Sequence, residues 1–310
     1  MKLFALAICA LAVAAQDPET GFRQLWNQEL LNKRPPAKNP AESLNRKATY
    51  KPIDKPAVVA VKKDTAVKET KKAQSAPPIS PNDTVLGVTM WRLRPARQAD
   101  GKNTTRLLIL PPDGDRSKAA ELVPERVDAD TPMKKGERVR LTVEVPRNGY
   151  LYVIDREVFA DGSTSDPYLI YPTRYTRQGE NFVAAGRILE IPDSRDIVNH
   201  FELDSKPNQV AEQFSILVTP EPLPGNMRAD PVALKVSEAE YGKWEKEFFV
   251  QCERWDLDGG AGKAWTETEE GAGRTGSKLT QDDPLPQTLY KITCQPGKAI
   301  LVKVPIKVGK

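Results

Sequence analysis

Few groups of residues in this chain have the types and spacing that catalysis or metal binding requires. The most polar segment is 161–166, DGSTSD, and Asp155, Asp193 and Asp196 lie near other predicted loops. Calcium takes six to eight oxygen ligands, and this segment could offer several, although its spacing differs from that of an EF-hand loop. Asp161-Gly162 also suits the bend of a hairpin. We therefore predict a polar turn and no metal site.

A single histidine limits the hydrolytic chemistry. A serine or cysteine nucleophile needs a base, usually histidine, and His200 is the only histidine. It lies in a predicted strand at 198–203, and a histidine in a strand is ordinarily a side chain at the surface of the sheet. Because two carboxylates could still meet in space, a carboxylate-dependent hydrolase of envelope polymers is the alternative function. We predict no catalytic residue.

Two glycine-rich segments match nucleotide-binding loops only in part. Residues 271–276, GAGRTG, have the glycine spacing of a dinucleotide-binding loop, but the residues before them, TETEE, do not predict the buried strand that such a loop needs. Residues 259–264, GGAGKA, lack the Ser or Thr that would hold magnesium. We predict no cofactor, and we expect residues 259–276 to form a long exposed loop.

The N-terminus has the features of a secretory signal peptide over residues 1–15. Lys2 precedes an apolar run, and small residues lead to Ala15, after which we expect cleavage and export to the periplasm or beyond. No later run approaches the roughly 20 apolar residues of a membrane span.

Cleavage would remove Cys9 and leave Cys252 and Cys294. Two cysteines in an exported chain predict a disulfide, with two free buried thiols as the alternative. A zinc site is disfavoured, because zinc normally takes four ligands and the thiols have only His200 to join them.

Two segments precede the predicted domain. Residues 16–33 predict a short amphipathic helix, whose apolar stripe could pack on the domain, as we favour, or dock on a partner or a membrane surface. Residues 34–83 predict a disordered linker rich in Pro, Lys and Ala; within 33–72, twelve Lys or Arg stand against four Asp or Glu, a net charge of +8. This linker could attract another envelope protein or an anionic envelope polymer, whereas nucleic acid is disfavoured. The apolar stripe of the helix predicted at 16–33 consists of Phe22, Leu25, Trp26, Leu30 and Leu31.

Residues 84–310 predict an all-β domain with a minor helix. Alternating valine and leucine at 139–145, a turn at 146–149 and the apolar run 150–154 predict a β-hairpin with one buried face and Arg140 on the other, exposed face. Short strands separated by turn residues predict an antiparallel β-sandwich, Ig-like or partly open as a barrel. A capping box at Ser237 opens a helix, and we expect the closing strands at 289–294 and 299–308 to complete the sandwich. The other predicted strands are 85–93, 106–110, 168–171, 186–191, 198–203 and 213–219.

A succession of short motifs runs through residues 136–222. It comprises GERV at 136–139, GYLYVID at 149–155, DG at 161–162, YP at 171–172, the AG and IP pairs of 185–192, and FSILVT at 214–219. In order and spacing these motifs resemble the bacterial family of domains of unknown function DUF4384. The resemblance implies a β fold and an exported or envelope protein, and it brings no established activity or site.

Together these patterns predict an exported, non-catalytic β-sandwich module that binds another protein or envelope component. A binding module should show an exposed apolar patch or an unprotected sheet edge. A hydrolase should instead show a pocket with converging carboxylates of shifted pKa.

Overall fold

The computed structural model describes residues 18–36, 45, 48–53, 80–102, 104–109, 119–174, 179–193, 199–204, 206–225, 227–229, 233–275 and 278–309. The predicted signal peptide and most of the predicted linker lie outside these residues. The structure differs from the linker prediction at Tyr50–Ile53, which form strand β1.

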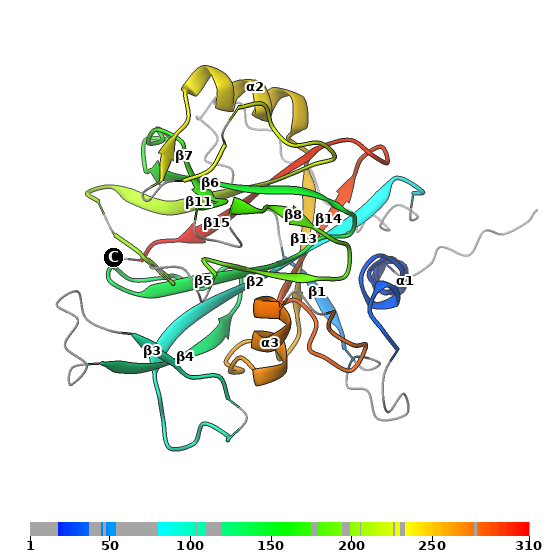
Figure 1. Cartoon of the computed structure of the whole chain (residues 1–310), viewed down its shortest axis with the longest axis vertical. Coiled ribbons are helices and arrows are strands. Elements are labelled where there is room, and N and C mark those ends of the chain that lie inside the picture. Colours follow the sequence, from blue (N-terminus) through cyan, green and yellow to red (C-terminus); the bar gives the residue numbers. More distant parts are fainter. Residues whose placement is uncertain are drawn as a thin grey trace, which may run out of the picture.

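Two antiparallel β-sheets pack face to face as a sandwich, and neither closes into a barrel (Figure 1). The all-β sandwich prediction is confirmed. The larger sheet contains β1 (Tyr50–Ile53), β13 (Cys252–Leu257), β14 (Thr288–Thr293), β2 (Asp83–Pro95), β4 (Ala120–Val127), β3 (Leu107–Ile109), β5 (Arg138–Glu144), β9 (Ile188–Ile191) and β10 (Phe201–Glu202). The smaller sheet contains β12 (Leu234–Lys235), β7 (Tyr168–Tyr171), β6 (Gly149–Phe159), β11 (Gln209–Thr219), β15 (Ile300–Lys307) and β8 (Phe182–Val183).

Strand β2 organises the larger sheet. One of its edges pairs with β5, while the other pairs with β14 along the first half of β2 and with β4 along the second half. On that side the sheet therefore divides into two ribbons, β14–β13–β1 and β4–β3. The β3–β4 ribbon projects from the body of the sandwich (Figure 1).

The prediction of a β-hairpin at 136–155 is wrong. Its two strands exist, but β5 pairs with β2, β9 and β10, whereas β6 pairs with β11, β7 and β8. The turn at 146–148 therefore carries the chain from one sheet to the other. Both strands have an apolar face, and these faces are buried in the main core between the sheets, where Val139 and Leu141 of β5 join Leu151 and Val153 of β6.

The outer face of β5 is also buried, contrary to the prediction that it meets solvent. Arg140 and Glu144 are 0% and 1% exposed. Other parts of the chain cover this face, because Arg34 and Glu269 reach into it from segments far away in sequence. Period-2 alternation correctly located the inner face, but it could not show that the charged face has partners.

Three α-helices and one short 3₁₀ turn lie among the described residues. Helix α1 (Pro18–Glu29), followed by the 3₁₀ turn Leu31–Lys33, packs the predicted apolar stripe against β1, β2 and β13. Helix α2 (Glu238–Phe248) covers the smaller sheet, and its cap Ser237 accepts a hydrogen bond from the Glu240 amide, as predicted. Helix α3 (Glu267–Thr275) lies beside β9 on the larger sheet. No helix in the described part of the chain is long and apolar enough to cross a membrane.

The closing strands are divided between the two sheets. β14 joins β2 and β15 joins β11, so the C-terminal segment contributes to both layers of the sandwich.

Candidate functional site

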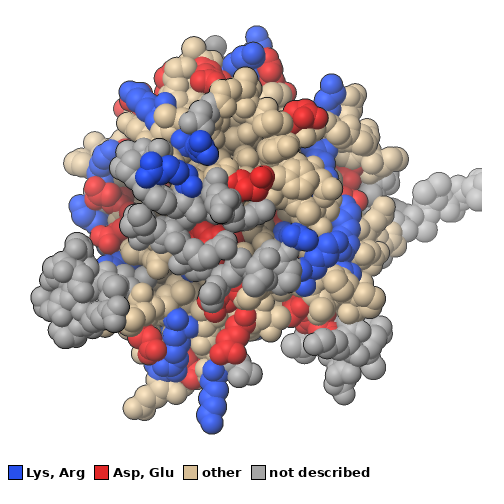
Figure 2. Space-filling model, in the orientation of Figure 1, with Lys and Arg blue, Asp and Glu red and all other residues tan. Residues whose placement is uncertain are grey.

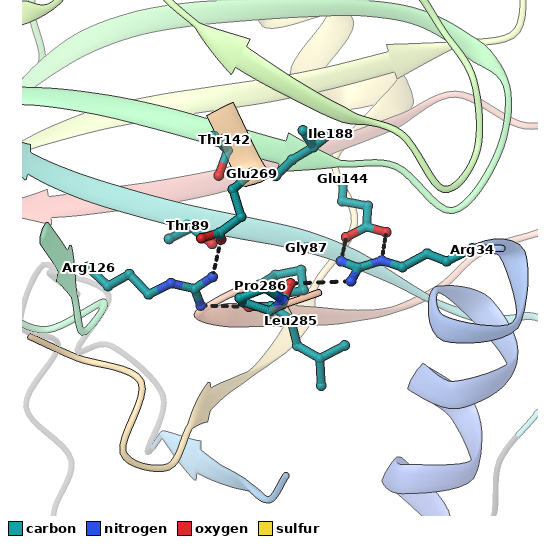
Figure 3. Close-up of a pocket in the computed structure, with 11 residues that line it drawn as sticks. Arg34, Gly87, Thr89, Arg126, Thr142, Glu144, Ile188, Glu269, Leu285 and Pro286 are labelled. Carbon is teal, nitrogen blue, oxygen red and sulfur yellow. Dashed lines mark hydrogen bonds and ion pairs between the residues drawn. The ribbon is translucent and has the colours of Figure 1, made fainter. Parts of the chain in front are cut away.

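The outer face of the larger sheet contains a small, charged, buried cavity (Figure 3). Its volume of about 10 Å³ leaves room for about one water molecule. The segment 284–286 closes it so tightly that a Cβ atom on Gly87 would lie 2.5 Å from Pro286 Cγ. The cavity is lined by Arg34, Gly87, Thr89, Arg126, Thr142, Glu144, Ile188, Glu269, Pro284, Leu285 and Pro286.

Arg34 and Glu144 form a bidentate ion pair at one end of this cavity. Arg34 Nε donates to Glu144 Oε1 at 3.0 Å, and Nη2 donates to Oε2 at 2.6 Å. The remaining nitrogen, Nη1, donates to the carbonyl oxygens of Asp283 and Pro284. Burial alone would lower the pKa of Arg34, but the Coulombic attraction and hydrogen bonds of Glu144 raise it. Arg34 therefore stays charged and ties the N-terminal segment to the sheet.

Arg126 and Glu269 form the matching pair at the other end. Arg126 Nη2 donates to Glu269 Oε1 at 2.5 Å, and Nη1 donates to the Leu285 carbonyl oxygen at 2.6 Å. Glu269 also accepts hydrogen bonds from the amide and hydroxyl of Thr266, whose own Oγ1 accepts from the Glu269 amide. This reciprocal capping box starts α3, so one glutamate both begins the helix and neutralises a buried arginine.

In each of these two pairs, the arginine and the glutamate bind each other. Each carboxylate is held in a buried ion pair with an arginine, and removal of one partner from such a pair is costly. The arrangement holds together segments that are distant in the sequence. It does so without offering an open position for a ligand larger than water.

A second group of titratable side chains lies on the inner face of the smaller sheet. Asp155 of β6 and Glu212 of β11 share a hydrogen bond, and Gln209 Nε2 donates to Glu212 Oε1 at 2.8 Å. Burial raises the pKa of both carboxyl groups, and their mutual repulsion raises that of Glu212 further. Glu157 lies opposite Glu212 and binds Lys206 at 2.7 Å. Asp155 was considered from the sequence, whereas Glu212 was missed, because sequence alone does not show which strands are neighbours.

A third feature is the outer edge of β3. β3 pairs with β4 through Leu107, Leu108 and Ile109, and no described strand pairs with its other edge. Leu108 is 62% exposed, the most exposed of the large apolar side chains in the described residues. The sequence predicted a strand here, but not that it ends a ribbon.

The polar segment 161–166 forms the predicted turn. It follows β6, and Asp161 Oδ1 accepts hydrogen bonds from the amide and hydroxyl of Ser163, which lower its pKa. Among the described residues, no group of three His, Cys, Asp or Glu side chains is placed to hold a metal ion. Asp193 is buried at the end of β9, and position 196 lies outside the described residues.

His200 lies just before β10, not within a strand as predicted. Its Nδ1 lies 3.0 Å from Asn199 Oδ1, and burial, with Arg138 nearby, lowers its pKa.

The two glycine-rich segments are not nucleotide loops in the structure. Gly271 and Gly273 lie within α3, and residues 258–262 form turns after β13. The prediction of an exposed loop over 259–276 is wrong, because this stretch contains a helix and the buried side chains of Trp265, Glu269 and Ala272.

The predicted disulfide is absent, and Cys252 and Cys294 are free thiols. The strand register explains why. Cys252 lies directly opposite Ile292, so Cys294 is two residues further along, in a diagonal position where separations are about 7–8 Å. A disulfide needs Cβ atoms about 3.5–4.5 Å apart. Burial raises the pKa of Cys252 to about 11, which keeps it a thiol.

A sandwich of two antiparallel sheets, with buried ion pairs on the outer face of the larger sheet, is thus the class of molecule that the structure defines. Residues 133–222 match the sequence profile of the family described as Domain of unknown function (DUF4384), so this part of the chain is a DUF4384 domain. The matched range runs from the approach to β5 through β11, and β2, β14 and β15 lie outside it. Comparisons with curated proteins and with solved structures gave no match.

Proposed function

We propose that this protein is an exported, non-catalytic binding module that accepts an extended segment of a polypeptide at the outer edge of β3. The observation that carries the proposal is the combination of an edge that no strand of the described residues pairs with and the exposed side chain of Leu108. An unpaired edge offers a row of amide and carbonyl groups to an incoming strand, and the side chains beside it supply specificity.

Two other edge strands in the described structure, β1 and β15, carry devices that proteins use against strand addition. β1 has exposed Lys51 and Pro52 on the strand itself, and proline has no amide hydrogen to offer. β15 contains Pro305, and its two ends are covered by backbone bridges to Phe249 and Met133. β3 contains neither proline nor charge. This contrast supports a binding role for β3.

The charged groups of the molecule support a non-catalytic role. The arginines and glutamates around the cavity form buried ion pairs, and these pairs hold together segments that are distant in the sequence. On the surface, Lys and Arg are interspersed with Asp and Glu on the face that Figure 2 shows, which does not favour recognition by one large field of a single sign. Export is supported by the signal-like residues 1–15.

The test is site-specific photo-crosslinking in the full chain. A photoreactive amino acid at position 108 should give discrete adducts with another polypeptide. The matched control is position 210, where Val210 is also apolar and 36% exposed but lies on β11. Adducts at 108 and not at 210 are expected. Equal adducts at both positions, or none at 108, would contradict the proposal.

A further inference from the structure

This inference goes beyond the proposed function and does not depend on the edge of β3. We infer that one end of the sandwich docks on a membrane surface that carries anionic lipid headgroups. The docking surface lies where the turn 146–148 takes the chain from β5 to β6, and we call it the basic end. Its cations are Lys33, Arg147, Arg187, Lys278 and Lys298, and they are bordered by the aromatic side chains of Tyr150 and Phe182.

Segments that are distant in the sequence bring these cations together. Lys33 Nζ donates to the Pro146 carbonyl oxygen at 2.5 Å, so the residue after α1 and the 3₁₀ turn binds the turn between the sheets. Lys278 Nζ in turn donates to the Lys33 carbonyl oxygen at 3.4 Å. Arg187, which precedes β9, forms a backbone bridge with Lys278.

The turn itself supplies Arg147, which binds the segment between β14 and β15. Arg147 Nη2 donates to the carbonyl oxygen of Lys298 and lies 3.9 Å from Cys294 Sγ. Neither partner is a carboxylate, so the hydrogen bonds fix the position of this guanidinium without neutralising it. The contacts therefore join all of the cations into one group at a single end of the molecule.

Most of this charge is not neutralised inside the described part of the chain. Lys33 binds Glu29 at 3.2 Å, whereas the other cations of the basic end form no ion pair with a described residue. Asp283, in the segment after Lys278, uses its carboxylate to accept from the amide and hydroxyl of Thr280. Figure 2 shows Lys and Arg side chains gathered on the side of the molecule where Figure 1 places α1. This is a local group on a face where charges of both signs otherwise alternate.

An exposed aromatic ring lies beside the cations. Phe182 is 39% exposed and packs edge to face against Tyr150, with ring centroids 5.5 Å apart. The Ala185 amide donates to Asn148 Oδ1 at 2.9 Å, which holds the segment that follows Phe182 against the turn that contains Arg147. Aromatic rings are enriched at the level of lipid headgroups, and Lys and Arg are attracted to anionic ones. The combination fits a membrane surface better than a soluble polyanion, because a soluble polyanion offers no apolar layer to the ring.

Flotation with lipid vesicles tests the inference. The protein is the chain from residue 16, the form expected after cleavage, since the apolar run within residues 1–15 would insert into any bilayer. It should float with vesicles that contain phosphatidylglycerol and stay behind with vesicles of phosphatidylcholine alone. Added salt should weaken the binding, because it screens charges at a surface.

The decisive variant combines Arg187→Gln, Lys278→Gln and Lys298→Gln, which remove three exposed cations of the basic end. It should bind phosphatidylglycerol vesicles at least tenfold more weakly, because each Lys or Arg near an anionic surface strengthens binding by about fivefold. Phe182→Ser should also weaken the binding while leaving its dependence on salt unchanged.

The matched control combines Lys134→Gln, Lys135→Gln and Lys206→Gln, which change the net charge by the same amount. These exposed lysines lie at the opposite end of the sandwich, before β5 and before β11, and two of them are paired with Asp204 and Glu157. Their removal should leave the vesicle binding unchanged. Equal weakening by the two triple variants, equal binding to neutral vesicles, or no binding to either kind would overturn the inference. A chain that ignores vesicles but binds soluble polyphosphate through the same three cations would also overturn it and would assign the basic end to an anionic polymer.

Discussion

The indole of Trp265 stacks on that of Trp91, with ring centroids 5.2 Å apart and planes inclined by 22°. Arg126 lies over the Trp91 ring at 5.1 Å, and Arg140 lies over the Trp265 ring at 5.3 Å, so two cations enclose two aromatic rings. Both tryptophans are fully buried. This stack joins the segment before α3 to β2 and β5, and it fixes the helix on the outer face of the larger sheet.

Replacement of Trp265 by alanine should therefore destabilise the whole domain. Loss of a buried aromatic side chain costs about 3–5 kcal/mol, and the two arginines would also lose part of their packing. Trp265→Phe should cost less, because it keeps a ring against Trp91. Urea unfolding measures both changes. A loss below about 0.5 kcal/mol for Trp265→Ala, the size expected of an exposed loop residue, would contradict this role.

The glycine content of residues 259–276 hid this stack in the sequence. Glycine disfavours helices, and five polar residues precede Gly271, so composition favoured a loop. The useful signal was local: Thr266 followed three residues later by Glu269 is a capping-box pattern. The buried partners of Glu269 and Trp265 lie on strands that the sequence does not place next to them.

A second prediction concerns the ion pair of Arg34 and Glu144. Because both side chains are buried, Arg34→Ala leaves an unpaired carboxylate inside the protein, and the free energy of unfolding should fall by about 3–5 kcal/mol. Lys51→Ala is the control, since Lys51 and Asp258 form an exposed pair, worth about 0–1 kcal/mol. Chemical denaturation compares the two, and similar small losses would show that Arg34 is not a fastening residue.

The strand pattern of β5 shows both what the sequence could predict and where it stopped. Alternation placed Val139 and Leu141 in the core, as the structure confirms. The same pattern assigned Arg140 to solvent, yet Arg140 forms an ion pair with Glu190 and donates to the Pro192 carbonyl oxygen at 2.8 Å. A charged residue in a strand is predicted to be exposed unless its partner is known, and the partners of this face, such as Arg34, Glu190 and Trp265, come from separate parts of the chain.

A third prediction concerns the N-terminal segment. Trp26 is buried in the small core under α1, and Tyr50 Oη donates to the Pro286 carbonyl oxygen at 2.7 Å. Cleavage at a protease site introduced between residues 60 and 70 should therefore leave the fragment that ends before the cut bound to the rest of the protein. The two pieces should co-elute in gel filtration without denaturant.

The matched variant for this experiment is Trp26→Ala, which removes the largest side chain of the helix stripe, one that is almost completely buried. After the same cleavage, this variant should release the N-terminal fragment more readily. Separation of the fragments from the parent protein at micromolar concentration would show that the helix is held only through the intact chain.

The last prediction follows from the carboxyl pair on the inner face of the smaller sheet. Asp155 and Glu212 have pKa values raised by burial to about 7 and about 9, from ordinary values near 4. The folded protein thus binds more protons than the unfolded chain over this range. Their contribution to stability is fully present below about pH 4 and is lost as pH rises through 7 and 9.

Thermal unfolding between pH 6 and pH 9.5 should therefore show a stability that falls as pH rises. Glu212→Gln should flatten this dependence, because the amide cannot lose a proton and can still donate a hydrogen bond to Asp155. Glu202→Gln, which removes an exposed carboxylate of β10, should leave the slope of the parent protein unchanged. A parent protein whose stability rises over this range, or a Glu212→Gln variant with the same slope, would show that the two carboxyl groups do not share a proton.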